Sequence, residues 1–280
     1  MSQHDFVSDK VIIVTGAGGG FGSRVSVQAA GRGARLVCAD IDEAAVRGTV
    51  ATIGETGGEA IAVGVDVRSI EQMRALAATT LERFGRIDVM VNNAGVMPLA
   101  FYADHEAALA AWHQCIDINF KGVLNGMVAV YDAMIAQGRG HVINLSSIYG
   151  NFPVAGAGVY GATKAAVNVL SESLRVESRG RIKVTTVKPT GVPGTGLSAG
   201  IVNREAIVGI VGQNMPDFAD SRQAYVEGRL DPAYLDPTRP EYMFLDPQFI
   251  ADAILHAIDQ PWGVSIGEVT VRATGDHFLL

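Results

Sequence analysis

Residues 11–22 read Val-Ile-Ile-Val-Thr-Gly-Ala-Gly-Gly-Gly-Phe-Gly, an apolar run that leads directly into a glycine-rich turn. A helical pattern follows over residues 21–32. Glycines let a backbone turn tightly and approach a pyrophosphate, and the N-terminus of the helix offers free N–H groups to the anion. The order strand, turn, helix therefore predicts a dinucleotide-binding loop. Its spacing fits two fingerprints: G-x-x-x-G-x-G through Gly16, Gly20 and Gly22, and G-x-x-G-x-x-G through Gly16, Gly19 and Gly22.

The rest of the chain repeats this alternation of apolar runs and helical patterns. Strands are predicted at residues 36–39, 60–65, 87–91, 141–145, 182–187 and 268–271, and helices at 43–56, 70–84, 105–137, 159–178 and 248–258. Strands that are rich in Val and Ile and separated by helices indicate a parallel sheet covered on both faces. Right-handed crossovers then give a doubly wound, Rossmann-type α/β fold of about seven strands.

One stretch departs from this rhythm. Residues 190–246 are rich in proline, lie between the sixth and last predicted strands, and are too long for an ordinary connection. Because they lack a strand pattern of their own, we expect a single domain over residues 1–280 with 190–246 as a substrate-binding lid. Four lid residues are candidates to line the substrate site: Met215, Phe218, Tyr225 and Tyr242.

The composition excludes several classes of protein. With 48% hydrophobic and 18% charged residues and a net charge of −7, the chain is too apolar to be disordered and too acidic for a nucleic-acid binder without a local basic patch. No apolar run is long enough to predict a membrane span, and no metal-ligand spacing is present. Cys38 and Cys115 form no C-x-x-C pair, and no signal-peptide pattern is visible, so we expect a cytoplasmic protein.

Asp40 ends the second predicted strand, 18 residues after Gly22. A carboxylate at this position suits the ribose hydroxyls of adenosine and repels a 2′-phosphate. No Arg or Lys stands in the glycine loop or directly after Asp40 to offset that charge. The pattern therefore favours NAD over NADP, and Asp42 is the better candidate for the N-cap of the following helix.

Tyr160 and Lys164 are four residues apart on a predicted helix, so their side chains share one face. An ammonium beside a phenol favours the phenolate and lowers the pKa of the phenol from about 10. Such a tyrosine is a usable acid or base near neutral pH. The helix follows the strand that ends at Ser146 and Ser147, at the edge of the sheet where ligands of such folds bind.

Taken together, these motifs resemble the short-chain dehydrogenase/reductase family in its single-domain variety. The resemblance covers nearly the whole chain. It rests on the TGxxxGxG loop at residues 15–22, the NNAG at 92–95, an Asn at 119, a Ser thirteen residues before Tyr160, and Tyr-x-x-x-Lys at 160–164.

The resemblance implies a catalytic set of four residues. Tyr160 would exchange the hydroxyl proton, and Lys164 would hold the nicotinamide ribose and keep the pKa of Tyr160 low. Ser147, chosen over Ser146 by its spacing, would hydrogen-bond the carbonyl or alcohol oxygen. Asn119 would hold a water that links Lys164 to solvent.

The resemblance also implies contacts with the cofactor and the substrate. Cofactor contacts are expected from Gly16, Gly20, Phe21, Gly22, Asp40, Ile41, Asp66, Val67, Asn93, Ala94, Gly95, Tyr160, Lys164, Pro189 and Val192. Substrate contacts are expected from Val96, Ser147, Ile148, Tyr149, Val154, Tyr160 and Leu197, a mostly apolar set that suggests a hydrophobic or ring-bearing substrate. The family implies a homotetramer or a homodimer.

The chain departs from the family after the sixth strand. The family usually has Pro-Gly there, whereas here Pro189 is followed by Thr190. We expect the β-branched Thr190 to narrow the substrate site beside the nicotinamide. At the position where the family usually has a threonine, this chain has Gly194, and Thr195 comes one residue later. The cofactor contact that the family's threonine makes therefore does not carry over directly to Thr195.

The prediction is an NAD-dependent oxidoreductase that interconverts a secondary alcohol and a ketone. A non-catalytic dinucleotide sensor is the first alternative, although such proteins tend to lose the Tyr or the Lys. An epimerase or dehydratase would resemble a longer chain with a larger C-terminal domain. A serine hydrolase is suggested by G-x-S-x-G at residues 196–200, but a nucleophile elbow requires its serine directly after a strand, which Ser198 lacks.

Overall fold

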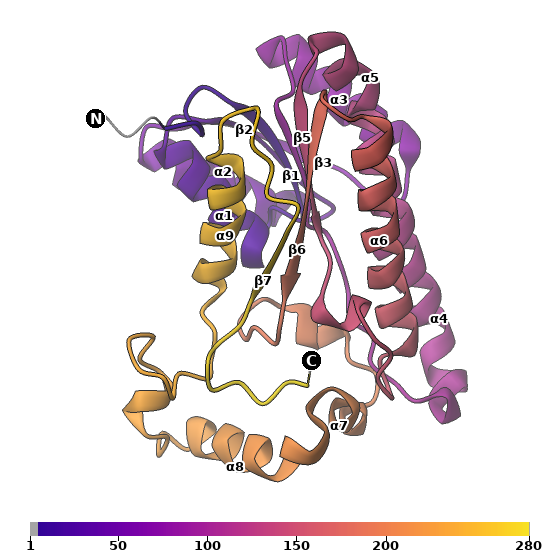
Figure 1. The fold of residues 1–280 in the computed structure, drawn as a ribbon, viewed down its shortest axis with the longest axis vertical. Helices are drawn as coiled ribbons and strands as arrows, with labels where there is room; N and C mark the ends of the chain where they lie inside the picture. The colour runs from indigo at the N-terminus through magenta and orange to yellow at the C-terminus, as the bar shows by residue number, and fades with distance from the viewer. Residues whose placement is uncertain (1–4, 280) are drawn as a thin grey trace.

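The glycine-rich turn follows β1, beside which the strand order of a seven-stranded parallel sheet reverses. The computed structural model describes residues 5–279 (Figure 1). The strands follow the spatial order β3-β2-β1-β4-β5-β6-β7. Their bounds are β1 Val11–Thr15, β2 Arg35–Asp40, β3 Glu59–Gly64, β4 Val89–Asn92, β5 Gly140–Leu145, β6 Ile182–Pro189 and β7 Glu268–Val271. Ligands of open α/β sheets bind at such a reversal, outside the carboxyl ends of the strands.

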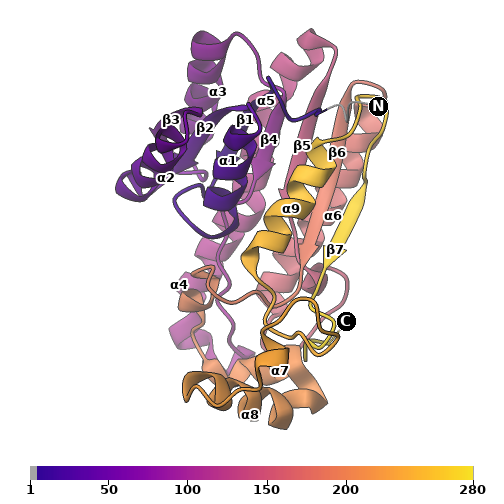
Figure 2. The same ribbon diagram turned by 90° about the vertical axis from the view of Figure 1, so that its left-hand side faces the viewer.

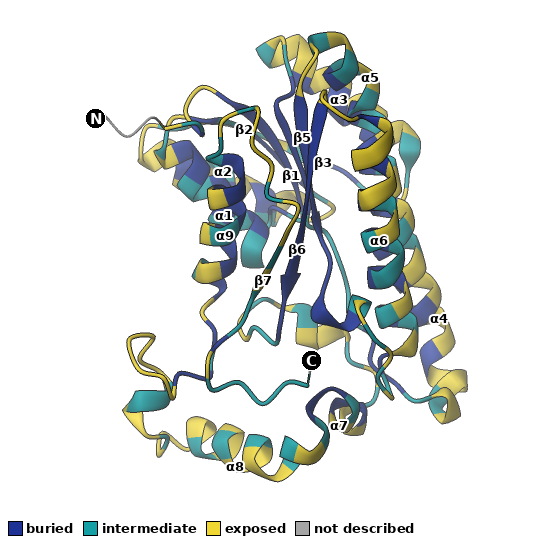
Figure 3. Ribbon diagram, in the orientation of Figure 1, coloured by how far each residue is buried: buried dark blue, intermediate teal, exposed yellow. Residues whose placement is uncertain are grey.

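Helices cover both faces of the sheet, as Figures 1 and 2 show from two directions. One face carries α1 (Gly20–Gly31), α2 (Glu43–Glu55) and α9 (Pro247–Ile258). The other carries α3 (Ile70–Phe84), α5 (Val123–Gln137) and α6 (Gly158–Glu177). As a consequence, β1, β4, β5 and β6 are buried along their whole length, and the dark blue of β5 and β6 shows this in Figure 3. The doubly wound α/β fold expected from the sequence is confirmed.

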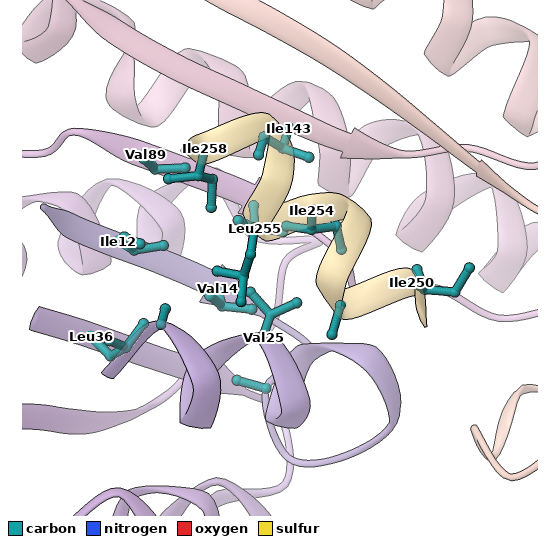
Figure 4. Close-up of a cluster of buried hydrophobic side chains, with 14 of the residues drawn as sticks. Ile12, Val14, Val25, Leu36, Val89, Ile143, Ile250, Ile254, Leu255 and Ile258 are labelled. Atoms are coloured by element: carbon teal, nitrogen blue, oxygen red, sulfur yellow. The ribbon is translucent and has the colours of Figure 1, made fainter. Parts of the chain in front are cut away.

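Alternate residues of β1 pack into the two layers. Ile12 and Val14 join the cluster formed with α1 and α9, whereas Ile13 joins the cluster on the opposite face. In the first cluster, Ile254 and Leu255 of α9 pack toward the sheet and α1 (Figure 4). Burying one such side chain stabilises the fold by roughly 1.5–3 kcal/mol. This core fixes the start of α1 against the end of β1, which positions the glycine turn between them.

The predicted helix 105–137 is continuous but is not α-helical throughout. α4 (His105–Cys115) passes into a π-helical segment, Ile116–Gly122, before α5 begins at Val123. Single π-helical turns inside α-helices are frequent at functional sites. This one contains Asn119, which is fully buried.

Residues 190–246 fold into short helical pieces below the ends of the strands. They include α7 (Ile207–Val211) and α8 (Met215–Val226), and Figures 1 and 2 both place the C-terminal end of the chain beside α7. Short 3-10 turns occur at Tyr102–Asp104, Ile148–Gly150, Leu197–Gly200, Arg204–Ala206, Gly212–Asn214 and Pro232–Tyr234. Within residues 5–279, no helix combines the length and the apolar character needed to cross a bilayer.

Candidate active site

The carboxyl ends of the strands border a cavity of about 750 Å³. Its walls come from the glycine turn, from the segments that follow β2 to β6, from α6 and from the segment 190–246. It therefore brings the predicted dinucleotide loop and the Tyr–Lys pair into one space. The predicted site residues that line it are Gly16, Gly20, Phe21, Asp40, Ile41, Asp66, Val67, Asn93, Ala94, Gly95, Val96, Ser147, Tyr149, Tyr160, Lys164, Pro189, Val192 and Leu197.

The backbone of the glycine turn decides between the two glycine spacings that the sequence allows. Gly20 has φ +54°, a left-handed conformation that favours glycine. A Cβ on Gly22 would lie 2.3 Å from the carbonyl oxygen of Gly16, whereas a Cβ on Gly19 would meet nothing within 4 Å. The structure therefore selects the spacing Gly16, Gly20, Gly22. Gly22 itself is buried behind the turn, so its role is to let the turn close, and the bare N-terminus of α1 suits a pyrophosphate.

Asn93, which directly follows β4, holds this turn in place. Its side-chain amide donates to the carbonyl oxygens of Thr15 (2.9 Å) and Gly16 (3.1 Å). The hydroxyl of Thr15 in turn accepts from the backbone N–H groups of Asn93 (3.1 Å) and Ala94 (3.3 Å). The NNAG segment thus fixes the turn, although the sequence suggested only that it contacts the cofactor.

Asp40 ends β2 beside the turn. One of its carboxylate oxygens accepts from the backbone N–H of Gly18 (2.8 Å) and the other from that of Asp42 (3.0 Å). The carboxylate is therefore held at the rim of the cavity, next to the largely exposed Ile41. Asp42 caps α2 by accepting from Ala45 N–H at 3.0 Å, so that prediction is confirmed.

Asp66 has a partner that the sequence did not suggest. The guanidinium of Arg68 donates from Nε to Oδ1 (2.9 Å) and from Nη2 to Oδ2 (2.6 Å) of this carboxylate. This hydrogen bonding lowers the pKa of Asp66. Both residues line the cavity together with Val67, and the cap of α3 is Ser69 rather than Asp66.

The two serines after β5 have different surroundings. The hydroxyl of Ser146 donates to the carbonyl oxygen of Lys164 at 3.0 Å and so ties β5 to α6. The hydroxyl of Ser147 accepts from the backbone N–H of Tyr149 (3.2 Å), and Ser147 lines the cavity together with Tyr160. Only Ser147 is therefore placed to share a ligand atom with Tyr160.

Tyr160 and Lys164 project from α6, with 4% and 5% of their surface exposed. Lys164 Nζ lies 5.7 Å from the centroid of the Tyr160 ring and donates to the carbonyl oxygen of Leu145 at 2.8 Å. Burial raises the pKa of Tyr160 to about 12, an effect that the neighbouring Ser147 side chain partly offsets, and burial lowers the pKa of Lys164 to about 8. The expected lowering of the tyrosine pKa is thus corrected, because desolvation of the phenol outweighs the other contributions.

Asn119 lies behind this pair and is fully buried rather than part of the cavity wall. Its Oδ1 accepts from the backbone N–H of Val96 (2.9 Å), and its Nδ2 donates to the carbonyl oxygen of Val96 (2.8 Å). A Cβ on Gly95 would lie 3.3 Å from Asn119 Oδ1 and 3.7 Å from Lys164 Nζ. The side chain therefore fixes the backbone that runs past the lysine, and its predicted role in holding a water stays a prediction.

The segment after β6, where the sequence departs from the usual family pattern, contacts the C-terminal part of the chain through Thr190. The hydroxyl of Thr190 donates to Asp276 Oδ2 at 3.0 Å, so it is turned toward the C-terminal segment although the residue lines the cavity. Thr195 also lines the cavity, and its hydroxyl is 3.4 Å from the carbonyl oxygen of Val192. Thr190 thus connects the segment after β6 to the C-terminal segment of the chain.

Two of the predicted substrate contacts do not reach the cavity. Ile148 and Val154 pack in an apolar cluster with Leu99 and Ala157, because the 3-10 turn at Ile148–Gly150 directs Tyr149 rather than Ile148 to the cavity. Among the lid candidates, Phe218 and Tyr225 line the cavity. Met215 packs against the same apolar cluster, and Tyr242 belongs to the cluster under α9.

Sequence reasoning missed a group of apolar and polar wall residues. They are Arg68, Met97, Gln114, Ile118, Ile201, Ile207, Ile210, Arg222, Met243, Phe244, His277 and Phe278. The run Ile-Val-Gly-Ile-Val at residues 207–211 was a readable helical signal, since α7 occupies that range. No local pattern in the sequence predicts Phe278 as a wall residue, because its ring packs against Gly191 and Phe218, which are distant in the sequence.

The rival interpretations find little support in this geometry. β6 ends at Pro189, and Ser198 lies in a 3-10 turn after an irregular segment, so it is not on a nucleophile elbow. Over residues 5–279, no hydrogen bond joins Ser198 to a histidine or an acidic side chain. The same part of the chain holds no group of three or more His, Cys, Asp or Glu residues that would fit a metal ion.

Comparison with known proteins gives a consistent result. The family model described as short chain dehydrogenase matches residues 10–206. An uncharacterized oxidoreductase of Listeria monocytogenes is 36% identical over 274 residues, which cover 96% of this chain and 98% of the relative.

Solved structures of similar proteins hold either nicotinamide dinucleotide. A short chain dehydrogenase/reductase of Burkholderia phymatum in complex with NAD has a TM-score of 0.74 and 28% identity, over 95% of this chain and 90% of its own. A metagenomic short-chain oxidoreductase in complex with NADP has a TM-score of 0.72 and 29% identity, over 96% of this chain and 99% of its own.

Proposed function

Because this chain belongs to the short-chain dehydrogenase family, we propose that it is an NAD(H)-dependent oxidoreductase that interconverts a secondary alcohol and a ketone. The observation that carries the proposal is the placement of Ser147, Tyr160 and Lys164 in one cavity with the glycine turn. A dinucleotide sensor would not need a buried phenol in one cavity with a buried serine and a buried lysine. A cofactor bound along the turn would supply or accept a hydride at the substrate carbon.

The protein side chains handle the substrate oxygen and its proton. Ser147 and Tyr160 hold the oxygen between their hydroxyls, and Tyr160 donates its proton to the ketone oxygen or takes the proton of the alcohol. With its pKa raised to about 12, Tyr160 is protonated at neutral pH and ready to act as the acid in ketone reduction. Lys164, with its pKa lowered to about 8, is able to return a proton to this site near neutral pH. Asn119 positions the backbone beside that lysine.

The cofactor preference follows from charges at the adenosine end of the cavity. Asp40 presents a carboxylate there, which accepts ribose hydroxyls and repels a 2′-phosphate. Arg68 lines the cavity beside Asp66 and Val67, and its guanidinium is already paired with Asp66. The two solved relatives carry different dinucleotides, so the choice rests on this chain's own residues, and these favour NAD.

The substrate end of the cavity is apolar. Tyr149, Ile207, Ile210 and Phe218 form much of its wall, with Leu197 and Phe278 beside them. Residues 190–246 act as a lid that supplies most of these side chains. A hydrophobic or ring-bearing alcohol or ketone fits such a wall.

Two further features bear on the setting of the enzyme. The apolar side chains of Val128, Val169 and Val176 on α5 and α6 are 44%, 70% and 59% exposed, which supports assembly as a homodimer or homotetramer. Light scattering of the purified protein tests the assembly, and a monomeric mass would contradict it.

Cys38 and Cys115 are free, buried thiols, which is in keeping with the reducing cytoplasm.

The experiment that tests the function is a panel of secondary alcohols and ketones assayed with NAD(H) and NADP(H). We expect turnover with apolar, ring-bearing members and a higher kcat/KM with NAD(H). Binding of NADH without turnover of any member would favour the sensor, and preference for NADP(H) would contradict the role given to Asp40.

A further inference from the structure

The C-terminal segment 276–279 returns to the cavity and is anchored there by Asp276, whose side chain is 1% exposed. Its Oδ2 accepts from the Thr190 hydroxyl at 3.0 Å. Its Oδ1 pairs with the Arg272 guanidinium and accepts from the backbone N–H of Phe278 at 3.3 Å. A buried carboxylate with this many partners is costly to disturb, so the segment is held in one position.

Phe278 is fitted to the segment after β6. A Cβ on Gly191 would lie only 1.9 Å from the Cζ atom of the Phe278 ring, so the ring rests directly on the glycine backbone. Phe278 and Gly191 both line the cavity, next to Thr190. The departure from the family at Thr190 and the aromatic ring at Phe278 therefore belong to one structural unit.

The same segment is tied to the lid. The carbonyl oxygen of His277 accepts from the side-chain amide of Asn214 at 3.0 Å, and Leu279 N–H donates to the carbonyl oxygen of Ile210 at 3.1 Å. The rings of Phe218 and Phe278 lie 5.9 Å apart in an edge-on arrangement. Residues 276–279 thus join α7 and α8 to the end of β6.

We propose that this segment determines the substrate specificity of the site. Phe278 is the wall that limits the size of an apolar group on the substrate, and the Asp276–Thr190 hydrogen bond is the anchor that positions it. This inference rests on the proposed function, because it names a specificity-determining residue of the same site. The substrate class is a ketone or alcohol whose apolar ring packs against Phe278.

The first test is the variant Phe278→Ala, assayed with NADH on aryl methyl ketones graded in size. Removing the ring enlarges the cavity. We therefore expect kcat/KM for the largest ketone, divided by kcat/KM for the smallest, to rise by about tenfold or more. The rise should come mainly from KM. Phe84→Ala is the matched control, since Phe84 is a half-buried phenylalanine on α3 outside the cavity. A ratio that stays the same in Phe278→Ala as in Phe84→Ala would overturn the proposal.

The second test does not depend on turnover. Thr190→Val removes the hydroxyl at nearly constant shape, and Thr52→Val is the control on the exposed face of α2. Hydrogen exchange of the C-terminal peptide should become several-fold faster in Thr190→Val only, most clearly at the Leu279 amide. Unchanged exchange would overturn the anchor. If the wild type reduces no ketone while Thr190→Val loosens the segment, the proposed function fails and the anchor stands.

Discussion

Asn119 and Val96 hold each other through a pair of hydrogen bonds, from Val96 N–H to Asn119 Oδ1 (2.9 Å) and from Asn119 Nδ2 to the Val96 carbonyl (2.8 Å). The amide comes from a π-helical segment and the backbone from the loop after β4. A regular α-helix would aim position 119 in a different direction. The π-helical segment thus carries the amide that fixes the loop passing Lys164.

Replacing Asn119 with Leu removes both side-chain hydrogen bonds to the half-buried backbone of Val96, whose carbonyl keeps only the long contact from Cys115 Sγ (3.8 Å). We expect the free energy of unfolding to fall by roughly 1–3 kcal/mol and turnover to fall as well, because the loop beside Lys164 loses its support. Urea unfolding and initial rates measure the two effects. Unchanged stability would show that the pair contributes nothing to the fold.

The glycine turn offers a matched pair of substitutions. Gly22→Ala places a methyl group 2.3 Å from the Gly16 carbonyl oxygen, so the turn must open and NADH affinity should fall at least tenfold. Gly19→Ala meets nothing within 4 Å of its new methyl group and should change the affinity little. Fluorescence titration with NADH compares them. Equal losses in both variants would contradict the selected spacing.

Asp40→Asn removes the charge at the end of β2 and keeps an oxygen that accepts hydrogen bonds. We expect the ratio of kcat/KM with NAD to kcat/KM with NADP to fall by about tenfold, since repulsion of the 2′-phosphate is lost. The control is Asp42→Asn, which removes the negative charge of the neighbouring carboxylate that caps α2. A wild type that already prefers NADP would refute the argument.

His141 on β5 should make the fold sensitive to acid. It is fully buried, its Nε2 lies 2.8 Å from the Thr185 hydroxyl, and that hydroxyl donates to the Ile266 carbonyl oxygen, so Nε2 carries the proton. Burial and then the charges of Lys183 and Lys10 lower the pKa of His141 well below 6.5.

Because the unfolded chain takes up this proton first, stability is lost as the pH falls below about 6.5, by at most about 1.4 kcal/mol per pH unit. Urea unfolding from pH 7.5 to 5 should show a steeper loss in the wild type than in His141→Gln. Parallel pH profiles would contradict this assignment.

Much of this arrangement could be predicted from the sequence because it is local. The turn at residues 15–22 and the pair Tyr160 and Lys164 each lie in a short segment with a strong periodic pattern. Ile148 was misplaced because a single 3-10 turn reverses which side chain meets the cavity. Phe278 was missed because its partner Gly191 is distant in the sequence. The raised pKa of Tyr160 depends on its near-complete burial, which no spacing in the sequence reveals.

The central claim is that Tyr160 moves the proton while the glycine turn binds the cofactor. The most direct measurement compares wild type and Tyr160→Phe for ketone reduction and for NADH binding. We predict that kcat falls by about 10²–10⁴-fold, because the proton donor is lost, while the dissociation constant of NADH changes by less than about threefold, a difference under 1 kcal/mol. Substantial remaining turnover in Tyr160→Phe would contradict the account.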